Sequence, residues 1–73
     1  MIDVRLFATF REKRFKQRQM ALPDSQYVSD LLSQLEISVE QVGILLINGH
    51  SATPDSELNT EDVVSIFPAL GGG

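Results

Sequence analysis

The sequence predicts an α+β fold of two layers, in which one helix packs across a mixed sheet in the order β-β-α-β-β-β. A strongly amphipathic helical segment stands at residues 28–35, between two groups of short strand-like segments. Asn48-Gly49, the strongest hairpin signal in the chain, joins two segments of the second group. The short apolar segments near both ends of the chain indicate that the first and last strands are central and adjacent.

The first strand is expected over residues 2–10, where apolar and polar positions alternate. The even-numbered positions should face the core, which places Phe7 on the outer face. Residues 10–15 are polar and basic and lack a two-residue turn pair, so a longer loop is expected. Residues 16–22 are rich in Lys, Arg and Gln, as edge strands often are. The expected core positions of the first strand are Ile2, Val4, Leu6 and Ala8.

The helix should begin just after a proline-containing break, with Asp24 or Ser25 supplying the N-cap oxygen. Its apolar residues recur at i, i+3, i+4 and i+7, which is one stripe of a helix. A helix this short is marginal alone and must lie on a sheet. Ser38 and Gln41 have capping-box spacing, so a further short helical turn is expected there. The stripe consists of Val28, Leu31, Leu32 and Leu35.

Three strand segments follow the helix. Residues 44–47 are apolar on both parities, which predicts either a strand covered on both faces or one whose outer face a partner covers. Residues 50–52 return from the hairpin turn, and Leu58 is a lone apolar residue expected to plug into the core. Residues 63–67 form the last strand, with Val64 and Ile66 on one parity and Val63, Ser65 and Phe67 on the other.

Size and composition argue against a free-standing enzyme. A chain of 73 residues makes one domain and buries only about 60% of its unfolded surface. It has no Cys and one His, His50, which excludes disulfides and a histidine-cluster metal site. The longest apolar run, residues 42–47, is too short to span a bilayer, and the first residues do not open a signal peptide. A cytoplasmic protein without a membrane partner is therefore expected.

The charges are segregated along the chain, although the net charge is only −4. Residues 1–18 hold all six basic side chains, whereas residues 19–73 hold eight acidic ones and no Lys or Arg. No aromatic stacking platform accompanies the basic cluster, so a solvated loop and edge strand are favoured over a nucleic-acid site. A partner that meets the C-terminal half would be expected to be basic.

The last residues are the candidate functional element. An apolar strand runs into Pro68 and Leu70 and then into three glycines, expected as a tail over residues 71–73 beyond a domain over residues 1–70. No internal catalytic set is visible, because Ser51 beside His50 is not a dyad and the carboxylates at 61 and 62 suit an ordinary turn. The reactive group left is the carboxylate of Gly73; a frayed, inert end is the competing interpretation.

At this point the chain resembles the MoaD/ThiS sulfur carriers, which have the ubiquitin-like β-grasp fold. The resemblance covers essentially the whole chain. It is carried by the strand order, by Val4-Arg5-Leu6-Phe7-Ala8 with Arg11-Glu12, by Ile47-Asn48-Gly49, by Glu61-Asp62-Val63-Val64-Ser65-Ile66-Phe67-Pro68, and by the terminal Gly-Gly.

The resemblance implies that the chain is not catalytic alone and holds no permanently bound cofactor. A ubiquitin-activating-like enzyme would adenylate the terminal glycine with ATP, and a sulfur donor system would convert it to a thiocarboxylate. Phe67-Pro68 before the tail is similar to the small subunit of molybdopterin synthase, whose tail enters the large catalytic subunit in molybdenum cofactor biosynthesis. The carrier of thiamine thiazole synthesis, a ubiquitin-like modifier and a plain interaction module remain alternatives.

Carried onto this sequence, the resemblance assigns roles to two groups of residues. Gly73 would accept AMP and then sulfur, and Gly72 would let the chain pass a narrow channel. The expected docking residues are Phe7, Phe67, Pro68, Leu70 and Gly71. The family commonly has a residue other than glycine at the position of Gly71. Phe67 could instead be covered by its own fold.

Overall fold

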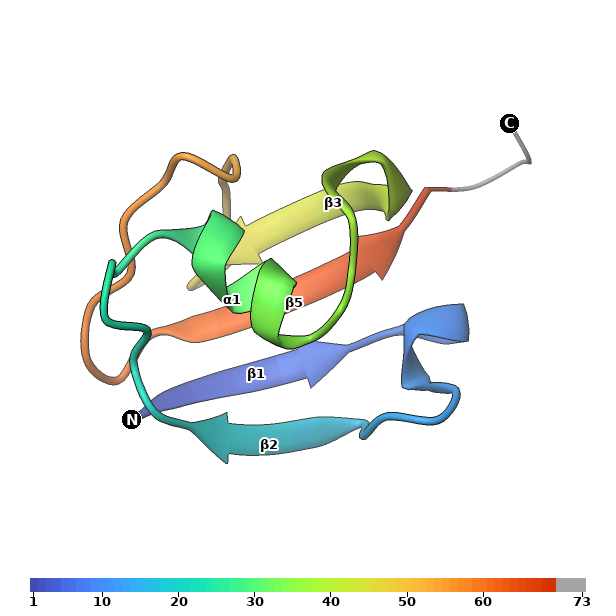
Figure 1. Ribbon diagram of the computed structural model, residues 1–73, viewed down its shortest axis with the longest axis horizontal. Coiled ribbons are helices and arrows are strands. Elements are labelled where there is room, and N and C mark those ends of the chain that lie inside the picture. Colours follow the sequence, from blue (N-terminus) through green and yellow to red (C-terminus); the bar gives the residue numbers. More distant parts are fainter. Residues whose placement is uncertain (70–73) are drawn as a thin grey trace.

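The structure is a computed structural model that describes residues 1–69. It confirms the predicted α+β class: a mixed five-stranded sheet of order β2-β1-β5-β3-β4, with β1 and β5 parallel and the other pairs antiparallel (Figure 1). The elements are β1 (Ile2–Leu6), η1 (Ala8–Arg11), β2 (Gln17–Met20), α1 (Val28–Gln34), η2 (Val39–Gln41), β3 (Val42–Ile47), β4 (His50–Ser51) and β5 (Val63–Pro68).

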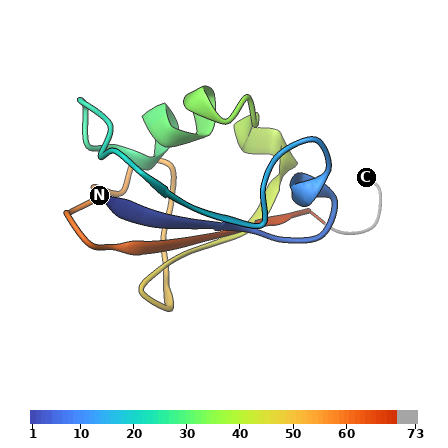
Figure 2. The same ribbon diagram turned by 90° about the horizontal axis from the view of Figure 1, so that it is seen from below.

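Within residues 1–69, the helical segments α1 and η2 cover one face of the sheet and leave the other face open (Figure 2). The core lies between α1 and the sheet, and the predicted alternation of β1 and β5 supplies much of it. Leu58 is 1% exposed, so its predicted role as a core plug is confirmed. The core residues are Ile2, Val4, Leu6, Phe10, Val28, Leu31, Leu32, Leu35, Ile37, Leu45, Leu58, Val64 and Ile66.

The first strand ends earlier than the alternation predicted. Strand β1 stops at Leu6, and Ala8 has a φ of +52° in the left-handed region, so Ala8 is exposed rather than part of the core. The chain tightens into the single turn η1 as the Phe10 N–H donates to the Phe7 carbonyl at 3.1 Å. This turn brings the Phe10 side chain into the core, where it is 4% exposed.

The helix begins without the predicted side-chain cap. Tyr27 occupies the N-cap position, and the Ser25 hydroxyl accepts instead from the Tyr27 N–H at 3.1 Å. The first free N–H groups of α1 donate to a distant loop: Val28 to the Ser56 carbonyl at 3.0 Å and Ser29 to the Pro54 carbonyl at 2.9 Å. Hydrogen bonds to the backbone of a distant loop therefore replace the expected side-chain cap.

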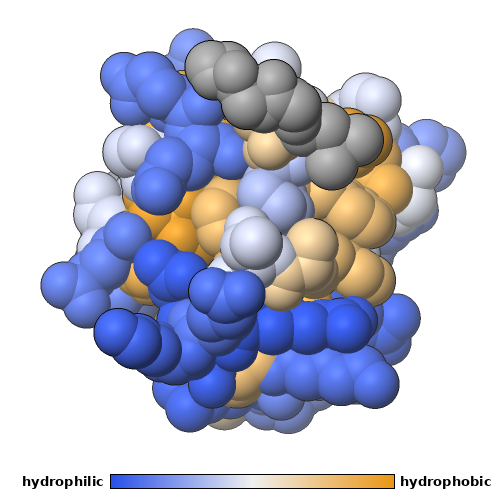
Figure 3. Space-filling view, turned by 90° about the vertical axis from the view of Figure 1, so that its right-hand side faces the viewer, coloured by the Kyte–Doolittle hydropathy of each residue, from blue (hydrophilic) through white to orange (hydrophobic). Residues whose placement is uncertain are grey.

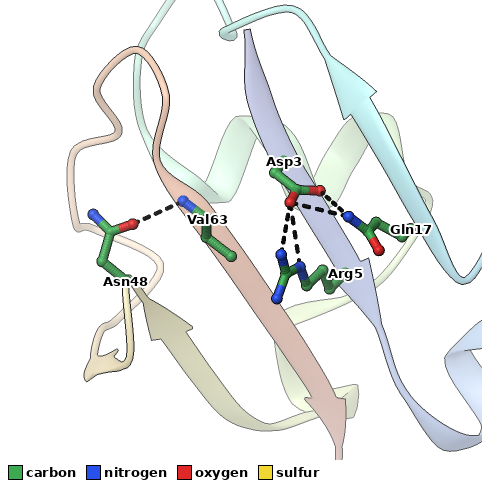
Figure 4. Close-up of polar contacts among 5 residues, drawn as sticks. All are labelled: Asp3, Arg5, Gln17, Asn48 and Val63. Atoms are coloured by element: carbon green, nitrogen blue, oxygen red, sulfur yellow. Dashed lines mark hydrogen bonds and ion pairs between the residues drawn. The ribbon is translucent and has the colours of Figure 1, made fainter.

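The hairpin and the start of β5 are joined by polar contacts of the Asn48 side chain. Asn48 and Gly49 have φ values of +52° and +83°, the left-handed pair that a tight hairpin turn requires. The Asn48 side chain accepts from the Val63 N–H at 2.9 Å (Figure 4). It also donates to the Asp62 carboxylate at 2.9 Å. Asp62, only 9% exposed, also accepts from the Asn59 N–H, so this carboxylate has a structural role.

The parallel pairing of β1 with β5 decides which loops share an end of the molecule. Because the two strands run side by side in one direction, the loop after β1 lies at the same end as the exit of β5 (Figure 1). The loop at residues 52–62, which leads into β5, lies at the opposite end. No helix within residues 1–69 is long and apolar enough to cross a membrane.

Candidate docking surface and tail root

The open face of the sheet carries an apolar patch formed by Phe7, Ile44, Leu46 and Phe67. Leu45 and Ile47 of β3 turn towards the core, so Ile44 and Leu46 face outwards. Ile44 is the register partner of Phe67 on the adjacent strand β5. At the end of the molecule where β5 leaves the sheet, apolar surface lies beside strongly hydrophilic side chains (Figure 3). A strand covered on both faces by its own fold, one of the two predictions for residues 44–47, is therefore wrong, and cover of the outer face by a partner stays a prediction.

Two aromatic rings organise the apolar patch. The rings of Phe7 and Phe67 stack with centroids 4.1 Å apart and an interplanar angle of 7°. The Arg11 guanidinium lies 5.2 Å from the centroid of Phe7. Both rings are half-buried and neither joins the core cluster, so each covers part of the other and leaves apolar surface outside. Together with Ile44, which is 54% exposed, they form a row that runs from the end of β1 across β5 to β3.

The part of the open face formed by β1 and β2 is polar. Asp3 and Arg5 of β1 form an ion pair at 3.0 Å, and the Gln17 side-chain amide donates to the Asp3 carboxylate at 3.1 Å (Figure 4). These side chains satisfy one another on the surface of β1 and β2. The open face therefore has a polar part, in which the charged and amide side chains pair with one another, and an apolar part, which is the apolar patch.

The exit of β5 is held in place at the edge of the apolar patch. Ala69, directly after Pro68, donates its N–H to the Gln41 carbonyl at 2.8 Å. At Gly43 the β3–β5 register shifts, and a Cβ there would stand 2.7 Å from the Ala69 Cα and 2.8 Å from the Pro68 carbonyl oxygen. Only glycine admits so close an approach of the two chains without displacement. Sequence reasoning missed Gly43, although a glycine inside an apolar strand segment is a recognised signal of a bulge.

The structure places three of the sequence-predicted site residues together. Phe7 and Phe67 lie in the apolar patch, and the half-buried Pro68 ends β5 beside it. The other predicted site residues, Leu70, Gly71, Gly72 and Gly73, lie outside the described residues. Ile44 and Leu46 were not singled out as docking residues, although the apolar character of both parities at 44–47 was their signal.

Fold and site together define a small β-grasp domain with an apolar sheet face next to the exit of its last strand. The chain belongs to the ThiS family, whose model matches residues 4–73. This confirms the expected membership of the MoaD/ThiS-type β-grasp sulfur carriers. A search of curated proteins gave no match.

Solved structures show the same fold. The chain is similar to a candidate molybdopterin converting factor, subunit 1, from Pyrococcus furiosus, with 25% identity over 94% of this chain and 97% of that one and a TM-score of 0.75. It is also similar to the HVO 2177 protein of Haloferax volcanii, with 28% identity over 99% and 85% of the two chains and a TM-score of 0.78. SAMP1 of the same organism, at 19% identity over 99% and 98% and a TM-score of 0.64, shares the fold.

Proposed function

We propose that this chain is a sulfur carrier whose reacting group is the carboxylate of Gly73. In the proposed cycle the carboxylate attacks the α-phosphorus of ATP on a ubiquitin-activating-like enzyme, which forms the acyl adenylate and releases pyrophosphate. A sulfide-equivalent nucleophile from the donor system then displaces AMP and leaves a thiocarboxylate. The domain contributes recognition and positioning, while the partner enzyme supplies the catalytic groups.

The observation that carries the proposal is the position of the β5 exit. The strand leaves the sheet beside the apolar patch, and both the Gln41 carbonyl and the closeness of Gly43 fix where it leaves. A partner that covers Phe67 and Ile44 would therefore receive the following residues from a defined point. Glycines suit a narrow channel, because they bring no Cβ near the attacked carbon and adopt extended conformations without strain.

For the sulfur acceptor, we propose the pterin of molybdopterin synthesis, with this chain as the small subunit of a molybdopterin synthase-type complex. Phe67-Pro68 and the similarity to the candidate molybdopterin converting factor subunit support this assignment. The thiazole-forming carrier of thiamine synthesis is the second candidate, and the family description supports it. A role as a protein modifier is left as an outcome of the tests.

The test of sulfur carriage is an intact-mass measurement after incubation with the activating enzyme, ATP and sulfide. Native protein should gain the mass of the adenylate when sulfide is omitted and of one oxygen-to-sulfur exchange when it is present. A variant lacking Gly73 should keep its fold and gain neither, because its carboxylate ends about 3.5 Å short. Absence of both products from the native protein would overturn the proposal.

The acceptor is tested by giving the thiocarboxylated protein to a large molybdopterin synthase subunit with its pterin substrate, and in parallel to a thiazole synthase. Formation of the dithiolene only in the first mixture supports the molybdopterin assignment, whereas thiazole formation only in the second overturns it. Amide bonds between Gly73 and lysines of other proteins, found in peptides from cells, would favour a modifier instead.

A further inference from the structure

The segregation of charge along the sequence becomes a segregation between the two ends of the molecule. Residues 8–18, which follow β1, carry five basic side chains and one acidic one. They lie at the end where β5 leaves the sheet, because β1 and β5 are parallel. The loops at the opposite end, residues 23–26 and 52–62, carry acidic side chains and no Lys or Arg.

The basic side chains at the basic end differ in the contacts that they make within the fold. Arg14 is committed to the fold, since its guanidinium donates to the carbonyls of Leu35, Phe10 and Glu36 and so caps the end of α1. The Arg18 guanidinium lies 4.3 Å from the centroid of the Phe15 ring.

Lys13 and Lys16 are exposed, and neither side chain has a hydrogen bond or an ion pair within residues 1–69.

This arrangement fits an extended acidic surface better than a single small anion. The open hollow beside the loop, of about 560 Å³, is lined by Glu12 and Glu36 as well as by Lys13 and Arg18, so its charge is mixed. The free ammonium groups stand on the exposed loop that follows Arg11, and the Arg11 guanidinium lies over the Phe7 ring of the apolar patch. Dispersed exposed charges of one sign act mainly at long range, by orienting partners before contact.

We propose that Lys13 and Lys16 face an acidic protein surface on the activating enzyme and turn the exit of β5 towards it during encounter. This inference rests on the proposed function. It reverses the partner charge that the sequence alone indicated for the C-terminal half, because the parallel pairing of β1 and β5 puts the chain's last strand and its basic loop at one end. The acidic far end strengthens the orientation, since the same enzyme surface repels it.

The test compares two double variants with equal net charge. Lys13→Gln/Lys16→Gln removes two positive charges at the basic end, and Ser29→Glu/Thr60→Glu adds two negative charges on exposed residues of the far end; both bring the net charge from −4 to −6. Association rates with the activating enzyme are measured by stopped flow, with ATP absent and present, from low to high ionic strength. Unchanged circular dichroism and urea unfolding verify the fold of each variant.

Lys13→Gln/Lys16→Gln should slow association on the order of tenfold at low salt and much less at high salt, with dissociation nearly unchanged. Ser29→Glu/Thr60→Glu should leave the association rate within about twofold. Equal slowing by both variants would overturn the inference, since net charge alone would then be responsible. A loss seen only with ATP bound would also overturn it, because the lysines would then face nucleotide phosphates. In either case the native protein is still adenylated, which separates this failure from failure of the proposed function.

Discussion

The two faces of the sheet are made from alternating residues of the same strands, and they use apolar side chains differently. On the covered face, Leu6 and Ile66 are 0% exposed under α1. On the open face, Phe7 and Phe67 stack on one another and stay half-exposed, and Ile44 is 54% exposed. A domain of this size needs the first set for stability. The second set stabilises the free protein less and is better suited to contact with a partner.

Loss of a covered side chain should have the largest effect on stability. Leu6→Ala removes a fully buried side chain from the central region of the sheet. The expected cost in the free energy of unfolding is about 2–5 kcal/mol, which is a large part of the total for a small domain. Urea unfolding measures it, with Arg5→Ala on the opposite face of the same strand as the control. A cost for Leu6→Ala no larger than that of the control would contradict the assignment of the two faces.

Phe67→Ala should reverse this balance between stability and binding. We expect a loss of about 2 kcal/mol in affinity for the activating enzyme, roughly 30-fold, because aromatic anchors dominate interfaces. The cost to stability should be about 1–2 kcal/mol, through the lost stack with Phe7 and partial burial. Calorimetric titration and urea unfolding give both numbers. Val63→Ala, on the same strand face but outside the apolar patch, should leave affinity unchanged; equal losses of affinity in the two variants would rule out the patch as the docking surface.

Gly43→Ala should disturb the exit of β5 more than the rest of the fold. Its new Cβ meets backbone of Pro68 and Ala69, so we expect a cost of about 1–3 kcal/mol in stability and slower adenylation with little change in affinity. Gly49→Ala is the matched control, since Gly49 has a φ of +83° and open space around it. That variant should be destabilised through its backbone alone and be adenylated at the native rate. Normal adenylation of Gly43→Ala would show that the exit point is unimportant.

The smallest effect is expected in the polar part of the open face. Asp3→Asn breaks an ion pair whose arginine is 45% exposed, and such pairs contribute less than about 1 kcal/mol. Affinity for the activating enzyme should not change. A marked loss of affinity, measured by the same titration, would extend the docking surface beyond the apolar patch and remove the distinction between the two parts.

The sequence predicted what depends on local pattern. The alternation of Val64 and Ile66 placed β5 in the core, the Asn48-Gly49 pair placed the hairpin, and the helical stripe placed α1. The predictions that were wrong depend on backbone conformation and on contacts between distant segments, which local pattern does not show. Alternation could not show that Ala8 takes a positive φ, and a polar residue before the helix could not reveal that the carbonyls of the 52–62 loop satisfy its first N–H groups.

For the candidate site, parity placed Phe7 and Phe67 on the outer face, but not in contact. The predicted adjacency of the first and last strands is confirmed, but the stacking also depends on their parallel direction and register, which the sequence did not predict. The same pairing places the basic loop beside the exit of β5, a relation that charge counts along the sequence cannot contain. Gly43 matters only because Ala69 approaches it, and that approach is set by the bulge between β3 and β5.

The most direct measurement of the account is ATP–pyrophosphate exchange by the activating enzyme, followed together with binding of the carrier. Native protein should bind and support exchange. A variant lacking Gly73 should bind with native affinity and support no exchange, because we propose that the domain provides the docking surface and Gly73 the reacting group. Exchange at the native rate without Gly73 would contradict the assignment of the reacting group, and loss of binding would contradict the separation of docking from chemistry.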